Sequence, residues 1–183
     1  MHNTLVMILA GGRGSRLGIL SKLRAKPAVP FAGMYRIIDF TLSNVMNSGF
    51  DIIGICTQYN PLSLMEHIGV GWHWDFTKRG KGAKILPPRT GETDSDWYKG
   101  TADAIYQNLD FIDTYEPERI LILSGDHIYH MDYSEMLAFH KDKGAELTIA
   151  MMEVPIADPP RLTTLIRSRH FETLHQSRER ASL

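Results

Sequence analysis

The sequence predicts an α/β protein with a doubly wound, mostly parallel sheet, and two observations lead to that prediction. Four short, almost continuously apolar runs occur along the chain, as expected of strands that are buried on both faces of a parallel sheet. Helical patterns separate these runs, and alternation of strands with helices is typical of βαβ units. The predicted strands are Leu5–Ala10, Ile52–Thr57, Ile120–Leu123 and Leu147–Met152.

Three of the predicted helices carry a recognisable start or stop signal. Glycine follows Asp39–Ser48 and also follows Tyr133–Lys143, and glycine favours the position just past a helix C-terminus. The helix predicted for Pro61–Ile68 begins with proline, which suits the first turn. These signals place a helix after each of several predicted strands, as a doubly wound sheet requires.

The stretch Thr101–Tyr115 has helical spacing throughout and is predicted to be one helix, with Thr101 as its N-cap. The stretch before it, Gly69–Trp97, is rich in glycine and basic residues, with one short strand predicted at Ala83–Leu86. Two interpretations of Gly69–Trp97 stay open at this point, a lid over a binding site and a variable surface loop.

Composition and charge exclude some classes of function. The 183-residue chain is 43% hydrophobic and 22% charged, with a formal net charge of -1. A nearly neutral chain is not expected to bind nucleic acid or a membrane surface. No apolar stretch approaches the roughly 20 residues that span a membrane. The single cysteine, Cys56, cannot form an intramolecular disulfide, which fits a reducing cytoplasm.

The most informative motif is a glycine-rich turn directly after the first predicted strand. A buried strand that runs into glycines presents bare backbone N–H groups at the carboxyl end of the sheet, where they can bind phosphate. The spacing fits neither the dinucleotide fingerprint nor the Walker A loop. By itself the turn is therefore equally compatible with an ordinary βα connection. The candidate phosphate-binding residues are Ala10, Gly11, Gly12, Gly14 and Ser15.

Two cations and one carboxylate are candidate catalytic residues. Arg16 and Lys26 could serve one polyanionic ligand. Asp126 follows a predicted strand through Ser124 and Gly125, a position suited to holding a divalent cation such as Mg²⁺ beside phosphates. The alternatives are a solvated basic loop around Lys26 and a capping role for Asp126.

A nucleoside pocket is predicted near two other segments. Gln58 follows a predicted strand and could bind a base edge through its amide, although a solvated loop amide is the simpler interpretation. The helix start formed by Gly100, Thr101, Ala102 and Asp103 lacks bulk and has free N–H groups, which allows a base or sugar to approach. Simple helix capping is the alternative there.

Taken together and in this order, the motifs resemble those of the sugar-nucleotide pyrophosphorylases. The glycine–arginine turn is shared by many sugar nucleotidyltransferases, whereas RAKPAVPF, RIIDFTLSN and WYKGTADA are more specific and point to the ADP-glucose branch. The resemblance covers about Thr4–Ile156. The matching blocks are Leu9–Leu17, Arg24–Phe31, Arg36–Asn44, Asn47–Gly49, Thr57–Tyr59, Trp97–Asn108 and Leu123–Tyr133.

The resemblance implies a Rossmann-like nucleotidyltransferase fold and one reaction, the transfer of an adenylyl group from ATP to glucose 1-phosphate with release of pyrophosphate. In that reaction the Gly11–Ser15 backbone would cradle the triphosphate and Arg16 would contact the departing phosphates. Lys26 would neutralise the phosphoryl centre, and Asp126 would hold Mg²⁺ as the cofactor.

The same resemblance assigns the remaining candidates. Gln58 and Gly100–Asp103 would line the adenine and ribose pocket, and Ser124 and Gly125 would adjoin the nucleotide. Trp97 and Tyr98 belong to a loop that the family relates to activator signalling. The implied assembly is a homotetramer, with no nucleic-acid or membrane partner.

The predicted domain organisation is a nucleotide-binding part over residues 1–156 and an atypical tail, out of frame or disordered, over 157–183. The family's sugar-phosphate-binding Glu-Lys-Pro motif and second metal-binding aspartate do not appear, so the sheet is predicted to be incomplete. A non-catalytic ATP-binding fragment or regulatory-type subunit is therefore the main alternative function. A pyrophosphorylase for dTTP or UTP is a weaker one, against which WYKGTADA argues.

Overall fold

The computed structural model describes residues 3–12, 14–69, 71–74, 82–88 and 97–151. The chain divides into two compact units, residues 1–133 and 134–183, and each is described by itself. Within the described ranges, no helix is both long enough and apolar enough to cross a membrane.

The first unit is built on a parallel sheet with strand order β5-β4-β1-β6. The central strand β1 (Thr4–Leu9) pairs on one side with β4 (Ile52–Cys56) and on the other with β6 (Arg119–Ser124). Strand β5 (Gly82–Leu86) pairs with β4. The chain therefore winds outward from β1 through β4 to β5 and then returns to the far side of β1. This confirms the predicted parallel α/β sheet and the predicted short strand at β5.

The strands end level with one another around β1. Leu9 lies opposite Cys56 of β4 and opposite Ser124 of β6 in the ladder. The segments that follow these three residues therefore leave the sheet at the same edge. The winding direction reverses between β1 and β6, and ligands of open α/β sheets bind beyond the carboxyl ends of the strands at such a point.

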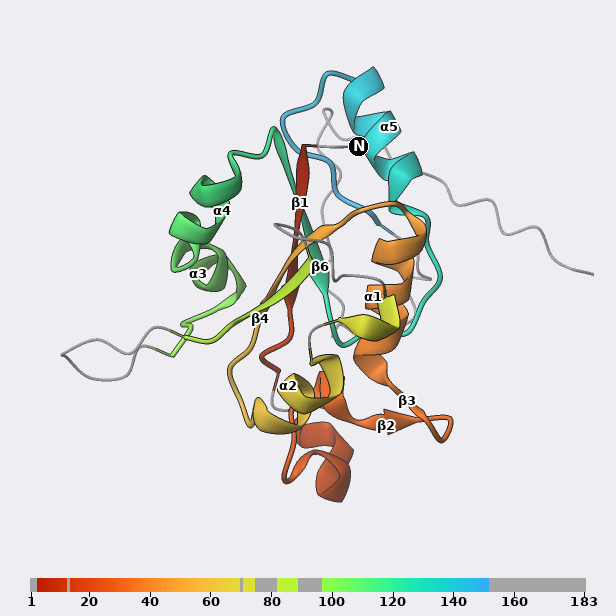
Figure 1. The fold of residues 1–183 in the computed structure, drawn as a ribbon, viewed down its shortest axis with the longest axis vertical. Coiled ribbons are helices and arrows are strands. Elements are labelled where there is room, and N and C mark those ends of the chain that lie inside the picture. Colours follow the sequence, from red (N-terminus) through yellow and green to blue (C-terminus); the bar gives the residue numbers. More distant parts are fainter. Residues whose placement is uncertain (1–2, 13, 70, 75–81, 89–96, 152–183) are drawn as a thin grey trace, which may run out of the picture. The chain divides into compact units, whose positions relative to one another are not determined.

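Helices cover both faces of this sheet (Figure 1). Helix α1 (Ile37–Asn47) lies on one face, and α3 (Thr101–Tyr106) and α4 (Leu109–Tyr115) lie on the other. A shorter helix, α2 (Leu62–Ile68), follows β4. An antiparallel pair of two-residue strands, β2 (Pro30–Phe31) and β3 (Tyr35–Arg36), precedes α1 and has no clear sequence signal.

The core is packed against both faces of β1. Leu5 and Met7 form a cluster with Ala104 of α3 and Ile112 of α4. Because successive side chains of a strand point to opposite faces, the intervening residues Val6 and Ile8 face α1's side, and both are fully buried. The central strand is thus closed off from solvent on both faces, which explains its continuous apolar run.

The single helix predicted over Thr101–Tyr115 is divided in the structure into α3 and α4. The break falls at Asn108, which is 6% exposed. Its side-chain Nδ2 donates to the Ala104 carbonyl at 2.8 Å and to Tyr98 Oη at 3.0 Å. This amide competes with the helical backbone for the Ala104 carbonyl, which is how asparagine commonly ends a helix.

The predicted N-cap of that helix is also wrong. Gly100 occupies the N-cap position, and Thr101 is the first helical residue and exposed, with no side-chain cap. The N–H of Lys99 instead donates to Asp103 Oδ2 at 2.8 Å. The carboxylate of Asp103 therefore fixes the entry into α3.

In the second unit, the predicted strand Leu147–Met152 is not present over residues 147–151, and Met152 lies outside the described residues. Leu147 and Ile149 are 68% and 36% exposed. Within the described part, no neighbouring strand pairs with this segment, so its backbone gains no ladder hydrogen bonds. It follows helix α5 (Tyr133–Asp142), and a 2.9 Å contact between His140 Nδ1 and Thr148 Oγ1 ties it to that helix.

Most of the Gly69–Trp97 stretch other than β5 lies outside the described residues, so the choice between lid and surface loop stays open there.

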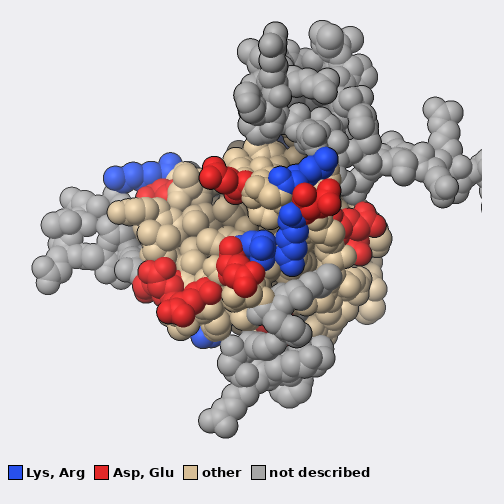
Figure 2. All heavy atoms as spheres, turned by 90° about the horizontal axis from the view of Figure 1, so that it is seen from above, with Lys and Arg blue, Asp and Glu red and all other residues tan. Residues whose placement is uncertain are grey.

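The charged side chains on the face seen in Figure 2 are of both signs and are interspersed among uncharged ones.

Candidate nucleotide-binding site

The turns after β1 and β6 lie side by side at the point where the winding direction reverses. The N–H of Gly125 donates to the Leu9 carbonyl at 3.0 Å, and the N–H of Ala10 donates to the Cys56 carbonyl at 2.8 Å. A Cβ at Gly125 would lie 3.0 Å from Ile8 Cγ2, so glycine allows this close approach of the two strands. Both turns therefore lie at the carboxyl edge of the sheet.

The glycine turn is held against the segment that carries Lys26. Gly14 has a left-handed backbone, with φ of 64°, and a Cβ there would come within 2.7 Å of Lys26 Cβ. The N–H of Lys26 donates to the Gly12 carbonyl at 3.0 Å, and Ser21 Oγ donates to the Gly14 carbonyl at 2.7 Å. Glycine at position 14 therefore permits the left-handed backbone, and because it has no side chain it leaves room for Lys26 beside the turn.

Lys26 reaches across to the end of β6. Its Nζ lies 2.9 Å from Asp126 Oδ2, with the two side chains 30% and 27% exposed. Ser124 Oγ donates to the other carboxylate oxygen, Oδ1, at 2.5 Å. The candidate phosphate cation and the candidate metal ligand, which the sequence placed 100 residues apart, thus form a direct ion pair.

The surroundings of Asp126 favour its charged form. Burial opposes ionisation of the carboxyl group, but hydrogen bonds from Ser124 and Lys26 and the positive charge of Lys26 outweigh it. The pKa of Asp126 therefore lies below its ordinary value. At neutral pH this group is a carboxylate, the form that binds a hard cation.

The donor set at Asp126 suits a metal that is shared with a ligand. Among the described residues, no group of three or more His, Cys, Asp or Glu side chains could hold a metal ion alone. Mg²⁺ is usually bound through one or two carboxylates together with substrate phosphates and water. The Oδ2 atom of Asp126 lies 3.8 Å from where a Gly12 Cβ would stand, so the carboxylate faces the glycine turn closely.

Gln58 and Tyr98 form the other side of the candidate site. Gln58 Nε2 donates to the Tyr98 carbonyl at 3.2 Å, and a Cβ at Gly11 would lie 2.9 Å from Gln58 Cβ. Tyr98 is 8% exposed, and its hydroxyl donates to the Leu86 carbonyl at 3.1 Å. Its neighbour Trp97 is 54% exposed. The structure thus brings Gln58 to the glycine turn. Of the two aromatic residues, Tyr98 is buried and contacts Gln58, whereas Trp97 is exposed.

Other predicted site residues are not joined to this centre. Arg16 is exposed in the 3-10 helix Ser15–Ser21, and Thr101 and Ala102 are exposed at the start of α3. No hydrogen bond or ion pair within the described ranges links any of them to the Lys26–Asp126 pair. An open cavity of about 490 Å³ lies beside the glycine turn. Its lining residues are Ser15, Gly18, Ile19, Ser21, Lys22 and Tyr59.

Sequence reasoning missed two residues that shape the site. Ser21 is 5% exposed and fixes the carbonyl of Gly14, and Asn108 holds the hydroxyl of Tyr98. A signal was available for Asn108, because it interrupts an otherwise apolar spacing in a predicted helix. No comparable signal marked Ser21, because the apolar residues around it are themselves exposed in the structure and do not form a buried pattern. These residues are Ile19, Leu20 and Leu23.

Comparison with known proteins identifies the family to which the chain is similar. A model of the nucleotidyl transferase family matches residues 5–163. The chain is 63% identical over 151 residues to a protein of Desulforamulus reducens named glucose-1-phosphate adenylyltransferase, covering 82% of this chain and 38% of the relative. A protein of Clostridium kluyveri with the same name is 62% identical over 152 residues, covering 83% of this chain and 40% of the relative.

A third relative, from Clostridium botulinum (strain Eklund 17B / Type B), carries the same name. It is 52% identical over 185 aligned positions, covering 100% of this chain and 48% of the relative. The chain therefore spans between about two fifths and one half of the length of these relatives. The family match extends over most of the chain, and the chain belongs to the nucleotidyl transferase family.

Proposed function

We propose that this chain binds ATP at the carboxyl ends of β1 and β6 and transfers its adenylyl group to glucose 1-phosphate, releasing pyrophosphate. The observation that carries the proposal is the glycine turn beside the Lys26–Asp126 ion pair, at 2.9 Å, where the winding direction of the sheet reverses. The names of the relatives support ATP and glucose 1-phosphate as the substrates.

The triphosphate would lie on the backbone of Gly11–Ser15. Gly11 and Gly12 present N–H groups without side chains, which allows phosphate oxygens to approach. Arg16, exposed one residue beyond this turn, would contact the departing β- and γ-phosphates. Lys26 would exchange its contact with Asp126 for the reacting phosphate and neutralise charge there.

Asp126 would hold Mg²⁺, with phosphate oxygens completing the coordination. When bound, the ion supplies charge neutralisation at the phosphates. Ser124 would orient the Asp126 carboxylate through its hydrogen bond to Oδ1. Gly125 would keep that carboxylate close to the end of β1.

The nucleoside would lie beside Gln58 and the start of α3. The Gln58 amide would bind the edge of adenine, and Gly100, Thr101, Ala102 and Asp103 would adjoin the ribose. Gly100 and Ala102 are exposed and small, which leaves room for a sugar. Tyr98 would support this pocket by holding Gln58, and the exposed Trp97 would respond to an activator.

The proposed chemistry needs no covalent enzyme intermediate. A phosphate oxygen of glucose 1-phosphate attacks the α-phosphorus of ATP in line, the bond to the bridging oxygen breaks, and pyrophosphate leaves. The protein's contribution is to position both substrates and to stabilise the spreading negative charge. Arg16, Lys26 and the Asp126 site are the charged groups available for that purpose.

The test is pyrophosphate release from ATP plus glucose 1-phosphate in the presence of Mg²⁺, using the 183-residue chain. Asp126→Asn should lower turnover by about 100-fold or more. Asp113→Asn, at an exposed position in α4, is the matched control and should leave turnover unchanged. Full activity of Asp126→Asn would exclude Asp126 from the site.

A second candidate function is ATP binding without turnover. It is favoured by the chain's coverage of only 38–48% of the relatives' length, because groups that bind the sugar phosphate in those proteins would then lie elsewhere. ATP binding by calorimetry without pyrophosphate release would support this second function over the first.

The assembly and location are proposals of the same kind. A homotetramer follows from the resemblance, and the single buried thiol of Cys56 favours a reducing compartment such as the cytoplasm. Light scattering of the purified chain tests the tetramer, and the mass of a monomer would contradict it.

A further inference from the structure

Helix α1 and the residue that caps its C-terminus, Ser48, carry buried polar residues along one face. Thr41, Asn44 and Ser48 are three and four residues apart, so they lie on the same side of the helix. All are buried, with exposed fractions of 0%, 5% and 4%. Polar side chains at buried positions are costly unless they form hydrogen bonds, so their partners show what this stripe is for.

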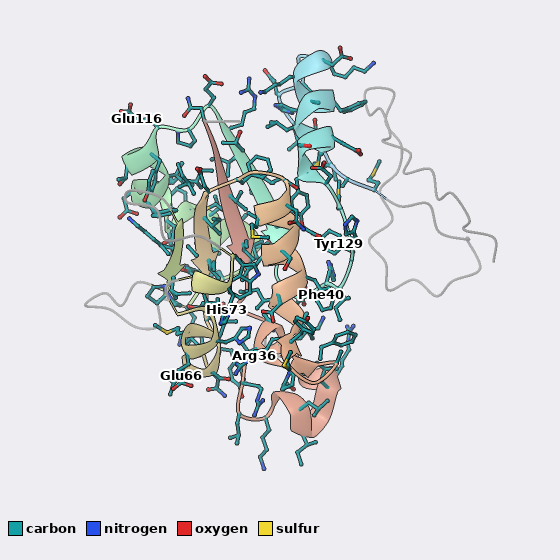
Figure 3. The ribbon with its side chains drawn as sticks, turned by 45° about the vertical axis from the view of Figure 1, so that its right-hand side comes forward. Arg36, Phe40, Glu66, His73, Glu116 and Tyr129 are labelled. Carbon is teal, nitrogen blue, oxygen red and sulfur yellow. The ribbon has the colours of Figure 1, made fainter. Side chains whose placement is uncertain are left out.

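All of these side chains bond to the segment that begins at the end of β6. Thr41 Oγ1 donates to the Ser124 carbonyl at 3.2 Å, and Asn44 Nδ2 donates to the Tyr129 carbonyl at 2.9 Å. Ser48 Oγ accepts the N–H of Tyr133 at 2.8 Å. Figure 3 shows Tyr129 on the loop beside α1. The helix therefore holds the loop at its start, middle and end.

The loop has little secondary structure of its own to fix it. Residues 125–132 belong to no helix or strand. The hydroxyl groups of Tyr129 and Tyr133 are 2.6 Å apart, which closes the far end of the loop on itself. Asp126 lies at the near end, two residues after Ser124. The position of its carboxylate therefore depends on contacts made to the loop from outside, and α1 supplies three of those among the described residues.

A short path connects the stripe to the Asp126 carboxylate. Thr41 fixes the carbonyl of Ser124, and the hydroxyl of the same serine donates to Asp126 Oδ1. Loss of the Thr41 hydroxyl would remove a hydrogen bond from Ser124, and Ser124 is the residue whose hydroxyl orients the Asp126 carboxylate. Small displacements of groups at a reacting centre have large effects on catalysis.

We propose that Thr41, Asn44 and Ser48 are positioning residues, which hold Asp126 where a metal–nucleotide complex can use it. This inference rests on the proposed function, because it concerns the same carboxylate. It assigns a role to the TLSN and NSG portions of the sequence that the binding site itself does not use. The stripe acts through the loop and does not touch the nucleotide.

The chain offers a matched set of variants on α1. Thr41→Val keeps the shape of the side chain and removes its hydrogen bond, whereas Thr41→Ser keeps the hydroxyl. Ser43→Ala removes a different hydrogen bond of the same helix, in which Ser43 Oγ accepts Trp74 Nε1 at 3.3 Å. That contact does not involve the loop that carries Asp126, so Ser43→Ala is the control for a general effect on the helix.

The test combines two measurements on the 183-residue chain. Electron paramagnetic resonance measures Mn²⁺ binding in the presence of ATP, and hydrogen exchange measures protection of residues 124–133. Thr41→Val should weaken Mn²⁺ binding roughly 2- to 10-fold and increase exchange in the loop. Thr41→Ser and Ser43→Ala should leave both close to those of the unaltered chain.

Two results would overturn the inference alone. The first is faster exchange in Thr41→Val with unchanged Mn²⁺ affinity, which would limit the stripe to a structural role. The second is an equal loss of affinity in Ser43→Ala. Failure of the unaltered chain to bind Mn²⁺ with ATP would instead contradict the proposed function, and the inference with it.

Discussion

Strands β1 and β6 lie side by side and both end at the candidate site, yet they are buried to different extents. In β1, Val6 and Ile8 are fully buried, whereas Ile120 and Ile122 of β6 are 41% and 51% exposed. β1 has paired strands on both sides, while β6 pairs only with β1 in the part of the chain that the structure describes. Two similar apolar runs therefore have different environments because of their places in the sheet.

The difference bears on how each strand positions its share of the site. β1 gives the glycine turn a fully packed base. Strand β6 is less fully packed before its turn, and the turn is held by hydrogen bonds from Gly125 to Leu9 and from α1 to the following loop. The phosphate-binding side of the site thus depends on core packing, and the metal-binding side depends more on polar contacts.

The largest expected effect comes from the core side of this comparison. Ile8→Ala should lower the free energy of unfolding by about 2–5 kcal/mol, because it leaves a cavity in a closed core. Ile122→Ala removes the same atoms from a half-exposed position and should cost about 1 kcal/mol or less. Urea unfolding of both variants measures the difference, and equal losses would mean that β6 is as well covered as β1.

The glycine turn offers the next largest effect. Gly14→Ala should cost at least about 1–2 kcal/mol for its left-handed backbone, and more because Lys26 Cβ lies 2.7 Å from the added atom. Gly144→Ala is the control, since it also has a positive φ, of 57°, but has nothing within 4 Å of the added Cβ. Thermal unfolding compares them. A smaller loss at Gly14 than at Gly144 would contradict the close packing of Lys26 against the turn.

A smaller effect is expected from pH on the Lys26–Asp126 pair. The pKa of Asp126 is lowered in the folded state, so its stabilising contribution is present above the ordinary carboxyl pKa of about 4. That contribution, about 1 kcal/mol or less for a partly exposed pair, is lost as pH falls through the lowered pKa. Between pH 6 and pH 3, the free energy of urea unfolding should therefore fall more steeply for the unaltered chain than for Lys26→Met. Parallel declines would show that the pair does not stabilise the fold.

Much of the sheet could be predicted from the sequence, because buried parallel strands leave continuous apolar runs. The same signal failed over residues 147–151, which have no neighbouring strand among the described residues, because pairing depends on the whole fold. The predicted helix over Thr101–Tyr115 failed at Asn108, since its spacing did not show that the amide would bond to Tyr98 and Ala104.

The candidate site shows the same division. The glycine turn and Asp126 could be proposed as candidates because each lies within three residues of the end of an apolar run. Their direct link through Lys26 could not, because it depends on how the segment around Gly14 folds back on itself. The polar residues on α1 were not identified from the sequence, because their partners lie more than 80 residues away in the chain.

The central claim is that the ends of β1 and β6 form one site for a metal–nucleotide complex. Calorimetric titration of ATP, with and without Mg²⁺, into the unaltered chain and into Asp126→Asn tests it most directly. The account predicts that Mg²⁺ strengthens ATP binding to the unaltered chain and that this gain is lost in Asp126→Asn, while metal-free binding persists. An equal gain from Mg²⁺ in both proteins would contradict it.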